Sequence, residues 1–214
     1  WLEKSAKESS ILCNKEHKCV LNGIDTKDTF FYRDAQELRR ELGLENKRIA
    51  LHVTAAFQEF KGSNYILELA KRMPDVVFVV VGNRENIPQC PKNIIPIGRI
   101  EDQSLLAQYY SMADVTVLTS KKETFSMVCA ESLACGTPVA GFKAGAPETI
   151  SLPQYSAFCE YADIEQLEHL IENMLGNPIF ADKEKISGIA VQAYSKRKMS
   201  SGYLEIYEGL INEN

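Results

Sequence analysis

Residues 123–139 read ETFSMVCAESLACGTPV, and the class of fold follows from them. We expect a helix over Phe125–Ala134, because small and apolar residues fill it and a Gly-Thr-Pro sequence ends it. A short apolar run stands on each side of this helix, VTVL at Val115–Leu118 and VAGF at Val139–Phe142. A helix between two such runs is typical of a parallel-sheet unit.

The same alternation of apolar runs and amphipathic stretches extends along the rest of the chain. The expected strands are Ile49–Val53, Val76–Val81, Asn93–Ile97, Val115–Leu118, Val139–Phe142 and Ala157–Cys159. The other expected helices are Ser63–Met73, with Ser63 as its N-cap, Asp102–Met112 and Asp163–Leu175, and the tail from residue 187 is helix-prone. The pattern predicts an α/β fold in which helices cover both faces of a doubly wound parallel sheet. Ligands of such sheets bind at the carboxyl ends of the strands, near the reversal of strand order.

Composition excludes several classes of function. The 214 residues carry a formal net charge of -5, which argues against a nucleic-acid binder. The longest apolar run, Val76–Val81, is too short to span a bilayer. The six cysteines form no Cys-x-x-Cys pair and have no histidine at zinc spacing, so we expect free thiols in a reducing cytoplasm and no metal site. His52 lies within a strand pattern and is expected to be a core histidine.

The two glutamates of the opening stretch suggest a site for a phosphorylated sugar. The start of the helix offers backbone N–H groups to an anion, and they belong to Phe125, Ser126, Met127 and Val128. Glu123 and Glu131 would then be free to accept hydrogen bonds from flanking sugar hydroxyls. In the alternative interpretation, Glu123 merely complements the helix dipole and Glu131 is a surface residue.

The spacing of these two glutamates, with seven residues between them, resembles the paired-glutamate motif of the retaining GT-B glycosyltransferases of family four. Further segments resemble the donor-binding C-terminal half of that family, in order: Val20–Asp25, Lys61-Gly62, Ala113–Val115, Gly145–Ile150 and Tyr203–Leu210. The ordered set covers nearly the entire chain. The resemblance implies a Rossmann-like domain, the C-terminal half of a GT-B fold.

The resemblance also implies roles for individual residues. Lys61 would contact the donor diphosphate, and Glu123 the transferred sugar, so these two are the expected catalytic residues. The N–H groups of Ser126–Val128 would contact the distal phosphate of the donor, and Glu131 would contact its ribose. Arg99 and Ile100, in a loop, would contact its base. The donor would be a UDP- or GDP-linked sugar, bound as substrate with no metal or cofactor.

The chain departs from the family pattern at three positions. Ala56 stands where the family usually has an arginine five residues before the lysine, so one cation for the diphosphate is missing, and Arg84 or Arg99 is a candidate substitute. Thr124 stands in place of a glycine, and Ser126 in place of another small residue. These changes affect how tightly a sugar approaches and therefore which donor is used.

The resemblance divides the chain into three parts. Residues 1–20 would be the tail of a linker from an absent N-terminal domain, 21–186 the nucleotide-sugar-binding domain, and 187–214 a helical segment returning to the absent domain. That absent domain would bind the acceptor and could contact the inner face of a membrane, so the isolated chain is expected to bind donor weakly without turnover. The overall likeness is to bacterial surface-polysaccharide enzymes. The alternatives are a non-transferase doubly wound binding module, such as a receiver-like domain, and a GT-B sugar-nucleotide epimerase or phosphorylase.

Overall fold

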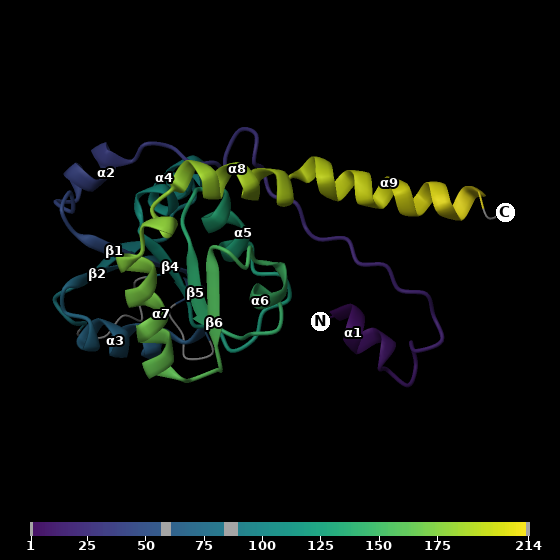
Figure 1. Cartoon of the computed structure of the whole chain (residues 1–214), viewed down its shortest axis with the longest axis horizontal. Helices are drawn as coiled ribbons and strands as arrows, with labels where there is room; N and C mark the ends of the chain where they lie inside the picture. The colour runs from purple at the N-terminus through teal and green to yellow at the C-terminus, as the bar shows by residue number, and fades with distance from the viewer. Residues whose placement is uncertain (1, 57–60, 84–89, 213–214) are drawn as a thin grey trace.

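The structure is a computed structural model that describes residues 2–56, 61–83 and 90–212. Its centre is a six-stranded parallel sheet in the order β3-β2-β1-β4-β5-β6 (Figure 1). The strands are β1 (Arg48–Ala56), β2 (Val76–Asn83), β3 (Ile94–Gly98), β4 (Val115–Leu118), β5 (Val139–Phe142) and β6 (Ser156–Cys159). The expected strands are therefore confirmed, with ends that differ by at most three residues.

Helices cover both faces of the sheet, as the apolar strands require. Successive strand residues point to opposite faces, so Leu51 joins one core cluster and Ala50 the other. The first face is covered by α2 (Gln36–Glu41), α4 (Gln103–Met112), α5 (Met127–Ala134) and α8 (Lys183–Ala193). The second face is covered by α3 (Ser63–Arg72) and α7 (Ile164–Gly176). The doubly wound α/β fold class is confirmed.

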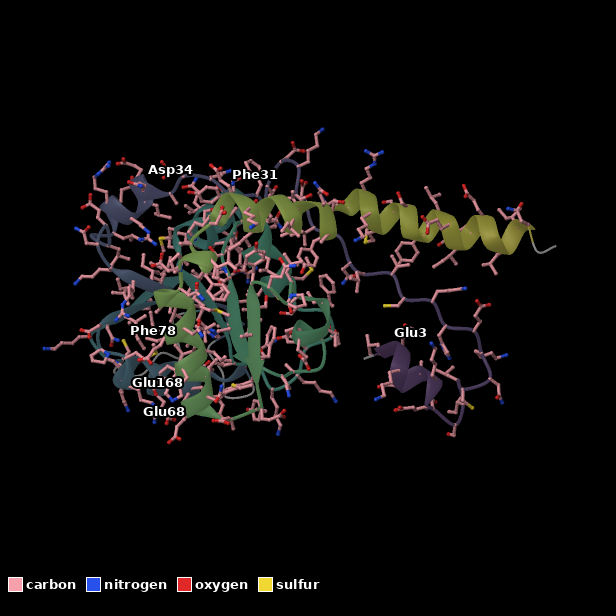
Figure 2. The ribbon with its side chains drawn as sticks, viewed as in Figure 1. Glu3, Phe31, Asp34, Glu68, Phe78 and Glu168 are labelled. Carbon is pink, nitrogen blue, oxygen red and sulfur yellow. The ribbon has the colours of Figure 1, made fainter. Side chains whose placement is uncertain are left out.

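The two helices of the second face are also joined at their surface. Arg72 of α3 forms an ion pair with Glu168 of α7. Figure 2 labels Glu168 and Glu68 on these helices and Phe78 in the sheet, where Phe78 is completely buried. The packing of α3 on α7 fixes the position of α3, which begins directly after Lys61-Gly62.

Helices α4 and α7 begin one residue later than predicted, and the starts of α5 and α3 differ in ways that concern the site. The motif helix α5 begins at Met127 and not at Phe125, because its N-cap Ser126 is in the left-handed region with φ 69° and breaks the helical path. Ser63 is the first residue of α3 and not its N-cap, which is Gly62 with φ 76°. Both turns lie at the carboxyl end of the sheet, and their backbone geometry shapes the site described below.

Strands β1 and β4 separate at the point where the strand order reverses. They pair only at Ala50 with Val115 and at Leu51 with Thr116, whereas β1 pairs with β2 along most of its length. Beyond this point a ring nitrogen of His52 lies 3.0 Å from the carbonyl oxygen of Val117 and bridges the two strands. The His52 contact therefore joins β1 and β4 just beyond their last paired residues, on the side of their carboxyl ends.

The two ends of the chain lie away from the sheet. Helix α1 (Leu2–Lys7) stands apart from it, and α9 (Lys196–Asn212) extends outward as a single helix (Figure 1). None of the described residues of α9 is buried. The predicted boundary at residue 187 falls inside α8, whose Ile186 and Ala190 are in the core.

Among the described residues, every helix is too short or too polar to cross a membrane. The short elements α6 (Pro147–Ile150) and the 3-10 helix Pro178–Phe180 complete the fold.

Candidate functional site

The candidate site lies where the carboxyl ends of β1, β4 and β5 meet. Lys61 follows β1, Glu123 follows β4, and Ala144 follows β5. The Thr119 hydroxyl donates to the carbonyl oxygen of Lys61 at 3.0 Å, and the Glu123 N–H donates to the carbonyl oxygen of Ala144 at 2.9 Å. Three loops are thus tied to one another at the strand-order reversal, where ligands of open α/β sheets bind.

An ion pair joins the two residues that were expected to be catalytic. The Lys61 ammonium donates to Glu123 Oε1 at 2.9 Å, and the two side chains are 30% and 22% exposed. Because both remain accessible to water, their attraction contributes little to the stability of the fold. The structure brings together two residues 62 positions apart and places a charge of each sign at this end of the sheet.

Helix α5 begins at Met127, four residues beyond Glu123. The N–H groups of Met127 and Val128 open this helix, and helical geometry provides no earlier carbonyl within the helix to accept from them. The Cys129 N–H, in contrast, donates to Ser126 O at 3.1 Å. Phe125 and Ser126 are buried and precede the helix, so of the four amides expected at the helix start, only the last two belong to it.

Ser126 itself is strained. A non-glycine residue in the left-handed region costs about 1–2 kcal/mol, and the Ser126 side chain forms no capping hydrogen bond that would offset this cost. Strain of this kind persists where the surrounding structure imposes it, and it gathers at functional sites. The strained turn thus stands between Glu123 and the first amides of α5.

Glu131 is half-buried on the side of α5 that faces α4. Its Oε2 accepts a hydrogen bond from the Tyr110 hydroxyl at 2.9 Å. Burial raises the pKa of the Glu131 carboxyl, and the hydrogen bond from Tyr110 acts in the lowering direction. A cationic partner for this carboxylate is not found among residues 2–56, 61–83 and 90–212. The alternative that Glu131 is a plain surface residue is therefore wrong.

The predicted base-binding residues are not at this point of the sheet. Arg99 follows the edge strand β3, its side chain is 76% exposed, and it faces Glu101 at 3.7 Å. Ile100 is half-buried against the core of the first face. Strand β2 lies between β3 and β1 in the sheet. Arg99 does not contact Lys61 or Glu123 in the structure. Arg84, the other candidate for the missing cation, lies outside the described residues.

Sequence reasoning missed two residues that shape the site, Thr119 and Tyr110. Thr119 is the first residue after β4, and its position at the start of a carboxyl-end loop was the available signal. Tyr110 looks like an ordinary core residue of α4, and its pairing with Glu131 follows only from how α4 packs on α5. Neither contact has a signature in the local sequence.

Two cavities at the opposite, amino end of the strands do not belong to this site. They have volumes of about 480 and 590 Å³ and share Arg39, Asp114 and Lys183 in their walls. Arg39 is paired with Asp114, and the Lys183 ammonium donates to the carbonyl oxygen of Ala113 and to Thr137 Oγ1. These charges are therefore used in holding the fold. Within the described ranges, no group of three or more His, Cys, Asp or Glu side chains could hold a metal ion.

His52 makes the fold sensitive to acid. Its side chain is 2% exposed, its Nε2 has no partner among the described residues, and burial lowers its pKa from 6.5 to about 4. The unfolded chain therefore binds a proton at His52 between pH 6.5 and 4 while the folded chain does not. We expect the free energy of unfolding to keep its full His52 contribution above pH 6.5 and to fall by about 3 kcal/mol as the pH drops to 4.

Urea unfolding of the wild type and of His52→Gln at pH 7 and pH 5 checks this prediction. The raised pKa of Glu131 acts in the opposite direction, so the comparison rests on the difference between variants and not on the slope of one protein. His52→Gln should lose less stability between the two pH values than the wild type. His169→Gln, on the exposed face of α7, is the control and should follow the wild type. Equal losses in all three proteins would contradict the role of His52.

A family model described as "Glycosyl transferases group 1" matches residues 34–190. Among curated proteins, the N-acetyl-alpha-D-glucosaminyl L-malate synthase of Bacillus anthracis is 26% identical over 217 residues, covering 94% of this chain and 56% of that protein. A solved sucrose-phosphate synthase from Thermosynechococcus elongatus has a TM-score of 0.80 at 23% identity, with 99% of this chain and 57% of the other covered. Anabaena Alr3699/HepE, solved in complex with UDP-glucose, has a TM-score of 0.74 at 19% identity, with 91% and 57% covered.

The chain matches only part of the length of each of these relatives. The chain spans about half the length of the curated relatives it matches, 56% of one and 38% of another. At identities below 25% the structural likenesses establish the fold. The family match covers most of the chain and includes every residue of the site described above.

Proposed function

The chain belongs to the group 1 glycosyl transferases, and from this premise we propose that it is the donor-binding half of an enzyme that transfers a sugar from a nucleoside diphosphate sugar with retention of configuration. The observation that carries the proposal is the 2.9 Å pair of Lys61 and Glu123 beside the N-terminus of α5. A cation, a carboxylate and helix amides gather at one end of the sheet, as a charged diphosphate joined to a hydroxylated sugar requires. Family membership argues against a receiver-like module.

In the proposed mechanism the diphosphate takes the place of Glu123 as the partner of Lys61. The Lys61 ammonium and the N–H groups of Met127 and Val128 stabilise the negative charge that builds up on the diphosphate as the bond to the sugar breaks. Glu123, released from Lys61, accepts a hydrogen bond from the sugar. Glu131 accepts hydrogen bonds from the ribose hydroxyls. The charge on the diphosphate is met by the chain itself, so the proposal includes no metal ion and no organic cofactor.

We propose a UDP- or GDP-linked sugar as the donor. The UDP-glucose bound by the Anabaena protein, which shares this fold, supports a uridine nucleotide. The acceptor would bind to a part of the protein beyond these 214 residues, as in an enzyme built from two facing halves. The isolated chain is then expected to bind donor weakly and to transfer no sugar. We further propose a cytoplasmic role in bacterial polysaccharide assembly, with membrane contact through the other half.

Calorimetric titration of the chain with UDP, GDP and ADP tests the proposal. We expect one of these nucleotides to bind, and Glu131→Gln to weaken that binding about 10–100-fold, because a hydrogen bond to a charged acceptor contributes about 1.5–3 kcal/mol. Glu172→Gln, an exposed position on α7, is the matched control and should leave the affinity unchanged. No binding of any of the three at millimolar concentration, or equal affinity of Glu131→Gln and the wild type, would contradict the proposal.

A further inference from the structure

The contact between Tyr110 and Glu131 joins a completely buried side chain to a carboxylate at the edge of the site. Tyr110 lies on α4 with none of its surface exposed, and its ring meets Phe30 edge to face at 6.4 Å between centroids. Its backbone carbonyl accepts a hydrogen bond from Thr137 Oγ1 at 2.6 Å. The ring is therefore held on several sides, and its hydroxyl presents a fixed donor to Glu131 Oε2 at 2.9 Å.

Glu131 is an unusual group to bury without a cation. A carboxylate that loses water must be compensated by hydrogen bonds or opposite charge, and Tyr110 is the single side-chain donor that the described residues provide to it. The carboxylate has about four acceptor positions, of which Tyr110 uses one. Most of its hydrogen-bonding capacity is therefore left for a ligand. The contact also fixes Oε2 as the oxygen that is held by Tyr110.

We infer that Tyr110 is a positioning residue that orients Glu131 to accept hydrogen bonds from the vicinal hydroxyls of the donor's ribose. This inference rests on the proposed function of Glu131. A rigid acceptor loses less side-chain entropy on binding than one that rotates freely, so the fixed carboxylate favours a ribonucleotide over its deoxy counterpart. Tyr110 makes no contact with the nucleotide and acts through Glu131.

Titration with UDP and 2′-deoxy-UDP, and with the matching guanosine pair, separates this role from a structural one. We expect the wild type to prefer the ribonucleotide about tenfold or more, by at least one charged hydrogen bond. Tyr110→Phe should weaken ribonucleotide binding about 5–10-fold and deoxynucleotide binding little, so that the preference narrows toward that of Glu131→Gln. Tyr109→Phe, a neighbouring buried tyrosine of the same helix, is the control and should keep the full preference.

A second readout comes from pH. The hydrogen bond from Tyr110 acts to lower the pKa of Glu131, so Tyr110→Phe should move the midpoint of ribonucleotide binding to higher pH. A tyrosine that only fills space would weaken both nucleotides equally and leave the midpoint in place, and that result would overturn the inference.

Two further outcomes distinguish this inference from the proposed function. If Glu131→Gln loses the ribose preference and Tyr110→Phe keeps it, the positioning role is wrong and the function of Glu131 stands. If Glu131→Gln keeps the preference, the proposed function of Glu131 fails first. Glu131→Asp tests the same contact without touching the buried ring, since the shorter side chain withdraws from Tyr110. A full ribose preference in Glu131→Asp would also overturn the inference.

Discussion

Replacing Gly62 by alanine is expected to lower the free energy of unfolding by about 3–5 kcal/mol, the largest stability effect of any single change discussed for this chain. A Cβ atom at this position would lie 2.1 Å from the carbonyl oxygen of Thr119 and 2.7 Å from its carbonyl carbon. Both contacts are with backbone, which cannot rotate away as the end of a side chain can. The residue also has φ +76°, which L-residues rarely adopt.

Gly43 provides a matched control for this change. It has φ +68°, and a Cβ atom there would have no heavy atom within 4 Å. Gly43→Ala therefore carries the cost of the left-handed backbone alone, about 1 kcal/mol after the reduced entropy of the unfolded chain is counted. Urea unfolding of both variants separates the close approach to Thr119 from backbone strain. Similar losses of stability in Gly62→Ala and Gly43→Ala would contradict the steric argument.

Gly62→Ala should also weaken nucleotide binding, beyond what its loss of stability alone would cause. Lys61 is adjacent to Gly62, and its carbonyl oxygen is held by the Thr119 hydroxyl at 3.0 Å. Moving the two loops apart to make room for a Cβ atom breaks this bond and displaces the Lys61 ammonium from Glu123. Under conditions where Gly62→Ala is still folded, we expect nucleotide titration to show weaker binding than in Gly43→Ala.

The central sheet and its layers were predictable from sequence because they depend on local patterns. Val76–Val81 is apolar at every position, and only a strand covered on both faces can bury such a run. Val115–Leu118 and Val139–Phe142 have the predicted bounds, since both are short, continuous apolar runs. The paired glutamates and the turn signals beside them are also local features, and from them a site for a phosphorylated sugar at the start of the motif helix was predicted.

The parts that sequence could not predict depend on contacts between distant segments. The left-handed Ser126 delays α5 by two residues, and no propensity favours a serine there. Glu131 is buried because α4 packs against α5 and brings Tyr110 to it. Arg99 matches a family position in the sequence but follows the edge strand, two strand positions from β1. Its predicted contact with the base of the nucleotide stays a prediction.

Lys61→Met is expected to weaken nucleoside diphosphate binding about 10–100-fold, as large an effect as that of Glu131→Gln. The variant loses a charge-assisted hydrogen bond to phosphate and leaves the Glu123 carboxylate next to the phosphate position, where it repels the diphosphate. Stability should change by about 1 kcal/mol or less, because the pair is partly exposed. Lys196→Met removes a lysine from a comparable ion pair with Asp25, at 3.0 Å, and should leave binding unchanged.

Glu123→Gln is expected to act in the opposite direction on the same measurement. In the free chain Glu123 competes with a diphosphate for the Lys61 ammonium, so its neutralisation should leave UDP binding unchanged or tighten it a few-fold. Any preference for UDP-glucose over UDP should decrease, because the sugar loses its charged acceptor. The double variant should bind UDP more tightly than Lys61→Met alone, since the repelling carboxylate is gone, and this coupling is the sign of two residues in contact. If Glu123→Gln weakens UDP binding as much as Lys61→Met does, then Glu123 assists the diphosphate site, and the exchange of partners at Lys61 is wrong.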